Sequence, residues 1–149
     1  MKLYIADCVL FIMTDEKRYR LRIDSQIVGY KRVLNENYEF YSRNGLWWTG
    51  HPLYYKQIDE FCGLRDINNQ LLYELDIVEY KIDIEAPGRK GVILWNRKDK
   101  EFCIKDLEDT GYFPVEVNGV QIFSPKSLKF HSFLFINPDI MEALGIVDE

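Results

Sequence analysis

The sequence predicts a mostly β protein: an N-terminal β half, then a C-terminal small β-barrel of SH3-like character that ends in one short helix. Three observations lead to this fold class. Aromatic residues make up 15% of the chain, and strands favour them. Several segments alternate between apolar and polar side chains. Two Asn-Gly dipeptides lie between such segments, and this dipeptide commonly closes two-residue hairpins.

The length bounds the number of domains. A chain of 149 residues forms one domain or two small halves that share a core, and it buries enough surface to need no disulfide staple. His51-Pro52 interrupts the strand pattern of the first half. We therefore expect a boundary near Leu53, with an N-terminal β subdomain at residues 1–53 and a C-terminal β domain at residues 54–149.

The first half is expected to consist of strands. Residues 3–13 are apolar, and residues 14–17 suit a turn. The segment "RYRLRI" (residues 18–23) alternates strictly, so its three arginines share one face of a strand. In "FYSRNGLWW", Asn44-Gly45 predicts a two-residue turn, which would pair Arg43 with Leu46 and Ser42 with Trp47.

The second half gives clearer strands. "DIVEYKIDI" (residues 76–84) alternates, with Val78, Tyr80, Ile82 and Ile84 on one face. "GVILW" (residues 91–95) is almost wholly apolar, which indicates a strand that is buried on both faces. "PVEVNGVQIF" predicts a hairpin around Asn118-Gly119, because apolar then pairs with apolar and polar with polar.

The end of the chain predicts a last strand and a helix. "KFHSFLFI" (residues 129–136) has the composition of a strand. Pro138 suits the first helical position after a capping Asn137, and Gly145 suits the residue that ends the helix. We expect a short helix over residues 138–144.

The segment "FCGLRDINNQLLYELDIVEY" (residues 61–80) holds two turns between apolar runs. Gly63 permits a tight turn, Asp66 can accept backbone N–H groups, and Asn68 opens an Asn-Asn pair that tolerates left-handed backbone. Tyr73 lies on the return strand. A second turn at Glu74-Leu75-Asp76 starts the next strand, and we expect Asp76 to be a buried or half-buried carboxylate that accepts N–H bonds. We expect these residues to have a structural role, because such a double turn takes the chain around the corner of a small barrel.

The same segment resembles the signature of the YopX-like proteins of phages and prophages. "GVILW" and "FHSFLFINPDIM" resemble two further blocks of that family in the same order, so the resemblance covers about residues 55–141. Three positions depart from the signature: Cys62, Asn69 and Leu75, and Leu75 replaces a glycine although leucine resists positive φ. Either that turn is not left-handed or this chain is built differently there. The matching residues are Phe61, Gly63, Leu64, Asp66, Asn68, Tyr73, Glu74, Asp76, Ile77 and Val78.

The resemblance implies a largely β fold, a phage-derived gene, homo-oligomers, and a family without an established biochemical activity. It therefore supplies no catalytic residues. We expect a phage or prophage accessory protein that is not an enzyme and acts through protein–protein contacts, with itself or with a host or phage protein, in the cytoplasm of the bacterial host.

Chemical motifs do not suggest a reaction. The cysteines, Cys8, Cys62 and Cys103, form no CxxC pair, which suits reduced and mostly buried thiols. His51 and His131 have no partner at metal-ligand spacing. There is no GxSxG sequence, no glycine-rich phosphate loop, and no apolar run long enough for a bilayer. We therefore expect no catalytic site, no metal, no cofactor and no membrane association.

The candidate partner-binding residues are basic and aromatic. An arginine-striped sheet face with exposed tryptophans beside it is how single-stranded nucleic acid is held, so a nucleic-acid-binding β module is the alternative function. The net charge of −5 disfavours it, and a stripe that is solvated or contacts another subunit is the simpler interpretation. The residues concerned are Arg18, Arg20, Arg22, Trp47 and Trp48.

Overall fold

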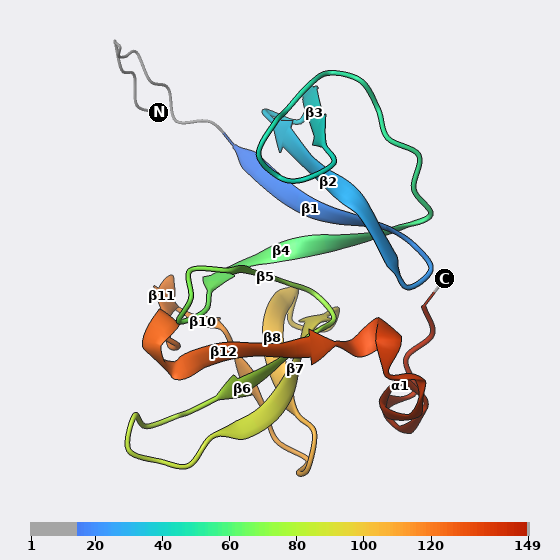
Figure 1. Ribbon diagram of the computed structural model, residues 1–149. Coiled ribbons are helices and arrows are strands. Elements are labelled where there is room, and N and C mark those ends of the chain that lie inside the picture. Colours follow the sequence, from blue (N-terminus) through green and yellow to red (C-terminus); the bar gives the residue numbers. More distant parts are fainter. Residues whose placement is uncertain (1–14, 149) are drawn as a thin grey trace.

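The computed structural model describes residues 15–148 and confirms a mostly β protein with one short C-terminal helix (Figure 1). Two antiparallel five-stranded sheets make up most of the molecule. The apolar stretch at residues 3–13 and the first residue of the turn predicted at 14–17 lie outside the described residues.

The first sheet has the order β3-β2-β1-β4-β5. The alternating arginine segment lies in β1, which pairs with β2 on one side and with β4 on the other. The boundary predicted near Leu53 falls between β3 and β4, and β4 and β5 complete the first sheet. The strands are β1 (Glu16–Ile23), β2 (Gln26–Leu34), β3 (Tyr38–Ser42), β4 (Gln57–Arg65) and β5 (Leu71–Tyr73).

The second sheet has the order β12-β6-β7-β8-β9, and a small hairpin, β10-β11, precedes its last strand in the sequence. The short helix α1 (Pro138–Leu144) lies beyond the end of β12 (Figure 1). The strands are β6 (Asp76–Tyr80), β7 (Arg89–Asn96), β8 (Glu101–Asp106), β9 (Tyr112–Pro114), β10 (Glu116–Val117), β11 (Val120–Gln121) and β12 (Leu128–Phe133).

The expected SH3-like barrel is not confirmed, because neither five-stranded sheet closes in the described part of the chain. The free side of β12 is covered by the turn after β4 instead of by β9. The N–H of Ile67 donates to the carbonyl of Leu128, and the N–H of Phe130 donates to the carboxylate of Asp66. An edge strand that is covered in this way has no need of a closing partner.

The core has two parts, one on each face of the second sheet. On one face, Cys62, Leu64 and Leu72 of the first sheet pack against residues that include Val78 and Ile93. On the other face, Ile77 and Val92 pack with Leu75, Leu134 and Phe135, and side chains of α1 cover them. This explains why β7 is apolar almost throughout, as its sequence predicts.

Local turn chemistry is confirmed in two places. The hairpin around Asn118-Gly119 pairs Val117 with Val120 and Glu116 with Gln121. The helix spans Pro138–Leu144, and Gly145 follows it with left-handed backbone, as expected.

Three other predictions are wrong. Asn44-Gly45 does not close a two-residue hairpin, because the Asn44 side chain accepts the N–H groups of Leu46 and Trp47 and a wider loop returns to pair Tyr41 with Thr49. The strand predicted to reach residue 84 ends at Tyr80, and residues 82 and 84 are exposed. The last strand stops at Phe133, after which residues 134–136 form a 3-10 turn.

Leu75 has φ +75°, so the second turn is left-handed even though leucine stands where glycine would be unstrained. The N–H of Leu75 donates to the carbonyl of Ile93, and its carbonyl accepts the N–H of Leu134. Its side chain is buried in the second part of the core. Strand β7, the 3-10 turn after β12 and the packing therefore hold a conformation that leucine alone disfavours.

We expect Leu75→Ala to lower the free energy of unfolding by about 2–4 kcal/mol, because it empties a buried site and keeps the strained φ. Leu75→Gly loses the same side chain but relieves about 1–2 kcal/mol of backbone strain, because glycine adopts a positive φ freely. The glycine variant should therefore be at least as stable as the alanine variant. Urea unfolding of the two variants measures this order. If glycine proves clearly less stable than alanine, the turn does not store the strain that its φ implies.

Candidate functional site

The arginines of β1 form a buried charge cluster instead of an exposed stripe. Arg20 and Arg22 share one face of the strand, as the alternation predicts, but only 2% and 1% of their surface is exposed. The expectation that this face is open to solvent is therefore wrong for both residues. A buried guanidinium needs carboxylate or carbonyl partners, and the structure provides them.

Asp59 of β4 is the centre of this cluster. One of its oxygens, Oδ2, accepts from the Nε of both Arg20 and Arg22, each at 2.8 Å, and Oδ1 accepts from the Nη2 of Arg22 at 2.9 Å. The antiparallel register places Asp59 opposite Arg20 on the neighbouring strand, which brings the charges together. One carboxylate thus neutralises and orients two guanidinium groups.

Asp76 joins the cluster to the second turn. Its Oδ1 accepts from the Nη1 of Arg20 at 2.5 Å, and its Oδ2 accepts the N–H of Tyr73 at 2.8 Å. The predicted role as a buried carboxylate that accepts a backbone N–H is confirmed. Burial raises the pKa of Asp76 to about 6, and Arg20 and the N–H of Tyr73 oppose this effect.

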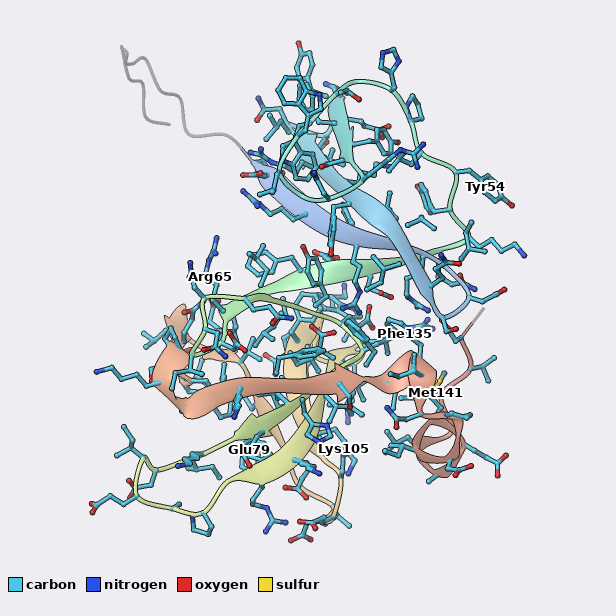
Figure 2. All side chains as sticks on the ribbon, in the orientation of Figure 1. Tyr54, Arg65, Glu79, Lys105, Phe135 and Met141 are labelled. Atoms are coloured by element: carbon cyan, nitrogen blue, oxygen red, sulfur yellow. The ribbon has the colours of Figure 1, made fainter. Side chains whose placement is uncertain are left out.

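Aromatic rings cover the two guanidinium groups. The ring of Phe135, the residue labelled in Figure 2, lies 4.0 Å from the Cζ of Arg22 and 5.1 Å from that of Arg20. The rings of Tyr73 and Phe133 also lie about 5 Å from Arg20. These contacts exclude water from the cluster and add a cation–π attraction.

Arg18 lies outside this cluster. Its side chain is half-buried and pairs with Glu16, whose carboxylate is also bound by Arg32. A guanidinium that already has a carboxylate partner is a poor contact for phosphate. Of the three arginines predicted to form a binding face, only Arg18 reaches the surface.

The two tryptophans predicted to bind a partner differ in their exposure. Trp48 is half-buried, and the guanidinium of Arg32 lies 5.3 Å from its ring. Trp47 is 76% exposed, in the loop between β3 and β4, where Leu46 is 84% and Tyr54 73% exposed. Figure 2 shows Tyr54 projecting outward from this loop. We call Leu46, Trp47 and Tyr54 the aromatic loop surface.

A hollow of about 360 Å³ adjoins this surface. The residues that line it include Tyr41, Trp47, His51, Pro52 and Leu53. The surface is therefore not flat, and it offers a place for a side chain of a partner.

The predicted motif of the double turn is structural. Gly63 has φ +92°, and Tyr73 ends β5 as a buried residue. The buried Asp66 accepts the N–H groups of Asn68 and Gln70 at Oδ1 and the N–H of Phe130 at Oδ2, each at 2.9 Å. Asp66 thus closes its own turn and attaches it to β12.

A cleft lies beside the buried cluster, and the sequence analysis did not predict it. Its volume is about 540 Å³, and Arg22, Lys56, Asp59, Arg97 and Asp148 are among the residues that line it. The local pattern does not indicate Asp59, because the apolar Ile58 beside it suggests the opposite inward face for this part of β4. Nothing in the local pattern indicates Asp148, which reaches Arg22 across 126 positions of the sequence.

The two cysteines among the described residues are buried. Burial raises the pKa of the Cys62 thiol to about 12 and that of Cys103 to about 11, so neither is a ready nucleophile. Residues 15–148 contain no group of three His, Cys, Asp or Glu side chains that could hold a metal ion. No helix in this part of the chain is long and apolar enough to cross a bilayer.

A scan of protein-family models, a search of curated proteins and a search of solved structures each gave no match to this chain.

Proposed function

We propose that this protein is a non-enzymatic accessory protein that acts through protein–protein contacts, as a homo-oligomer, and that the aromatic loop surface is its contact. The exposure of Leu46, Trp47 and Tyr54 on one loop is the observation that supports this most. Large apolar side chains exposed on a surface mark interaction sites, and tryptophan and tyrosine are the residues that most often dominate binding energy.

The loop is held in a defined conformation. Asn44 Oδ1 accepts the N–H groups of Leu46 and Trp47, and Ser42 Oγ accepts that of Gly45. Thr49 then pairs with Tyr41 at the edge of β3. A loop that is already ordered loses little entropy when it binds, which favours its use as a contact.

The nucleic-acid alternative has less support. It requires an arginine face open to phosphate groups, whereas Arg20 and Arg22 are buried with their carboxylates. The net charge of −5 adds no general attraction to a polyanion. Protein contacts through the loop need neither feature.

The biological setting in this proposal comes from the sequence resemblance to the YopX-like family alone. On that basis we propose a phage or prophage gene product that acts in the cytoplasm of a bacterial host.

Light scattering of the full chain tests the proposed function. We expect an oligomer at micromolar concentration, and Leu46→Ser with Trp47→Ser should weaken self-association at least about tenfold, because a central apolar contact contributes about 2 kcal/mol or more. The matched control is Ile82→Ser with Ile84→Ser, two similarly exposed apolar residues after β6, which should not change the oligomer.

Three results would contradict the proposed function. One is a monomer at high micromolar concentration, and another is an oligomer that the loop variant and the control weaken equally. The third is salt-sensitive micromolar binding of single-stranded nucleic acid, lost when Arg18 and Arg32 become glutamine, which would favour the alternative.

A further inference from the structure

The cleft of about 540 Å³ shares no lining residue with the aromatic loop surface. Its lining comes from β1 and β4, from the end of β7 and from the segment after α1. Arg22 of β1 and Asp148 of the last segment meet there. Figure 1 shows that this end of the chain reaches the loop between β1 and β2.

The hydrogen bonds of Arg22 indicate which chemical group fits this end of the cleft. Three of its five N–H donors are used within the first sheet: Nε and one Nη2 donor bond to Asp59, and one Nη1 donor bonds to the carbonyl of Asp24. The remaining two donors, one on each terminal nitrogen, bond to the two oxygens of Asp148 at 2.8 and 3.0 Å. This fork binds a planar anion with two oxygens, and a carboxylate fits it.

The segment that supplies this carboxylate is weakly attached. Gly145 ends the helix, and Ile146 packs partly on the core. Val147 is 77% exposed, and in the described part of the chain neither Val147 nor Asp148 makes a backbone hydrogen bond. The ion pair with Arg22 is therefore the main contact that keeps Asp148 in place.

The rest of the cleft also suits a ligand that carries a carboxylate. Lys56 and Arg97 line it with Arg22, and Glu74 is a carboxylate of the lining that does not bond to Arg22. Ile58, Leu94 and Trp95 give it an apolar wall. A ligand with a carboxylate next to an aliphatic side chain would satisfy both parts, and residues 146–148 of this chain have that composition.

We propose that the cleft at Arg22 is a binding site for an acidic peptide segment of a partner protein, in which aliphatic side chains precede a carboxylate, and that Asp148 of the same chain occupies the site until such a segment replaces it. The exchange keeps a carboxylate on the two N–H donors of Arg22 that Asp148 now occupies. It therefore leaves no N–H donor of this buried guanidinium without an acceptor, which would be unfavourable.

The test measures binding of a fluorescein-labelled peptide, Leu-Gly-Ile-Val-Asp-amide, to the full chain by fluorescence anisotropy. The wild-type protein should bind weakly, because a tethered competitor has an effective concentration in the millimolar range. Asp148→Ala removes this competitor and should tighten binding at least about tenfold. Glu142→Ala, an exposed carboxylate of α1, is the matched control and should behave as the wild type.

A peptide with Asn in place of Asp should lose most of the affinity. The proposal is overturned if Asp148→Ala binds no more tightly than Glu142→Ala, or if the Asn peptide binds equally well. It is also overturned if the Asp148→Ala variant does not bind the peptide and is a monomer while the wild-type protein is an oligomer. The segment of a second copy would then be the occupant of the cleft.

A measurement on the wild-type protein covers the case in which Asp148→Ala does not fold. Millimolar peptide should displace Asp148 and shift the Nε–Hε resonance of Arg22 in a nitrogen–proton NMR spectrum, and the Asn peptide should not. An unchanged resonance would exclude the exchange.

Discussion

Asp59→Ala is expected to lower the free energy of unfolding by about 3–5 kcal/mol, the largest effect of any single change considered for this chain. Asp59 is 2% exposed and accepts from the side chains of both Arg20 and Arg22. Its removal leaves the two buried guanidiniums without a shared counterion. Asp76 and Asp148 each continue to bind one of them, but neither reaches the two Nε atoms.

Urea unfolding of the variant and of Glu60→Ala measures this effect. Glu60 is the next residue of β4 and its side chain points to the other face, so its loss should change stability by less than about 1 kcal/mol. Asp59→Asn keeps one acceptor oxygen and should lie between the two. If Asp59→Ala were as stable as Glu60→Ala, the buried cluster would contribute nothing to folding.

The cluster also shows where sequence reasoning fails. Strict alternation placed Arg18, Arg20 and Arg22 on one face of a strand, and the structure agrees. The same alternation suggested that the charged face is the solvent face, which is wrong because the partners of Arg20 lie 39 and 56 positions away in the sequence. A pattern within one strand carries no information on a carboxylate that another strand brings to it.

The start of β4 carries the reverse of the usual pattern. Asp59 and Gln57 are buried, whereas Ile58 between them is exposed. The rule that apolar side chains point inward holds for Cys62 and Leu64 but assigns residues 57–59 to the wrong faces. Only the partner strand explains the inversion, since Asp59 is opposite Arg20 and Gln57 is opposite Arg22.

Features set by neighbours in the sequence were predictable. The hairpin at Asn118-Gly119 and the helix that ends before Gly145 depend on residues within a few positions, and both are found. Asn44-Gly45 has the same dipeptide, but there the Asn side chain bonds to its own loop and the hairpin does not form. The closure of a barrel depends on contacts between distant strands, and the expected barrel is not confirmed.

Asp66→Ala is expected to lower the free energy of unfolding by about 3–4 kcal/mol, because one buried carboxylate satisfies three backbone N–H groups and the loss of an acceptor costs about 1–3 kcal/mol for each donor left buried. Two of these donors, Asn68 and Gln70, belong to the turn that Asp66 closes. The third, Phe130, belongs to the edge strand β12 of the other sheet. The same side chain therefore shapes a turn and joins the two sheets.

Asp66→Asn separates these two roles. Its amide oxygen can still accept from Asn68 and Gln70, whereas its NH₂ group would face the N–H of Phe130 and cannot accept from it. We expect it to lose about 1–2 kcal/mol, less than the alanine variant. Hydrogen exchange should then speed up selectively at Phe130 and its neighbours in β12, with the turn still protected. If exchange rose in the turn and not in β12, the bond to Phe130 would not be what holds the edge of the second sheet.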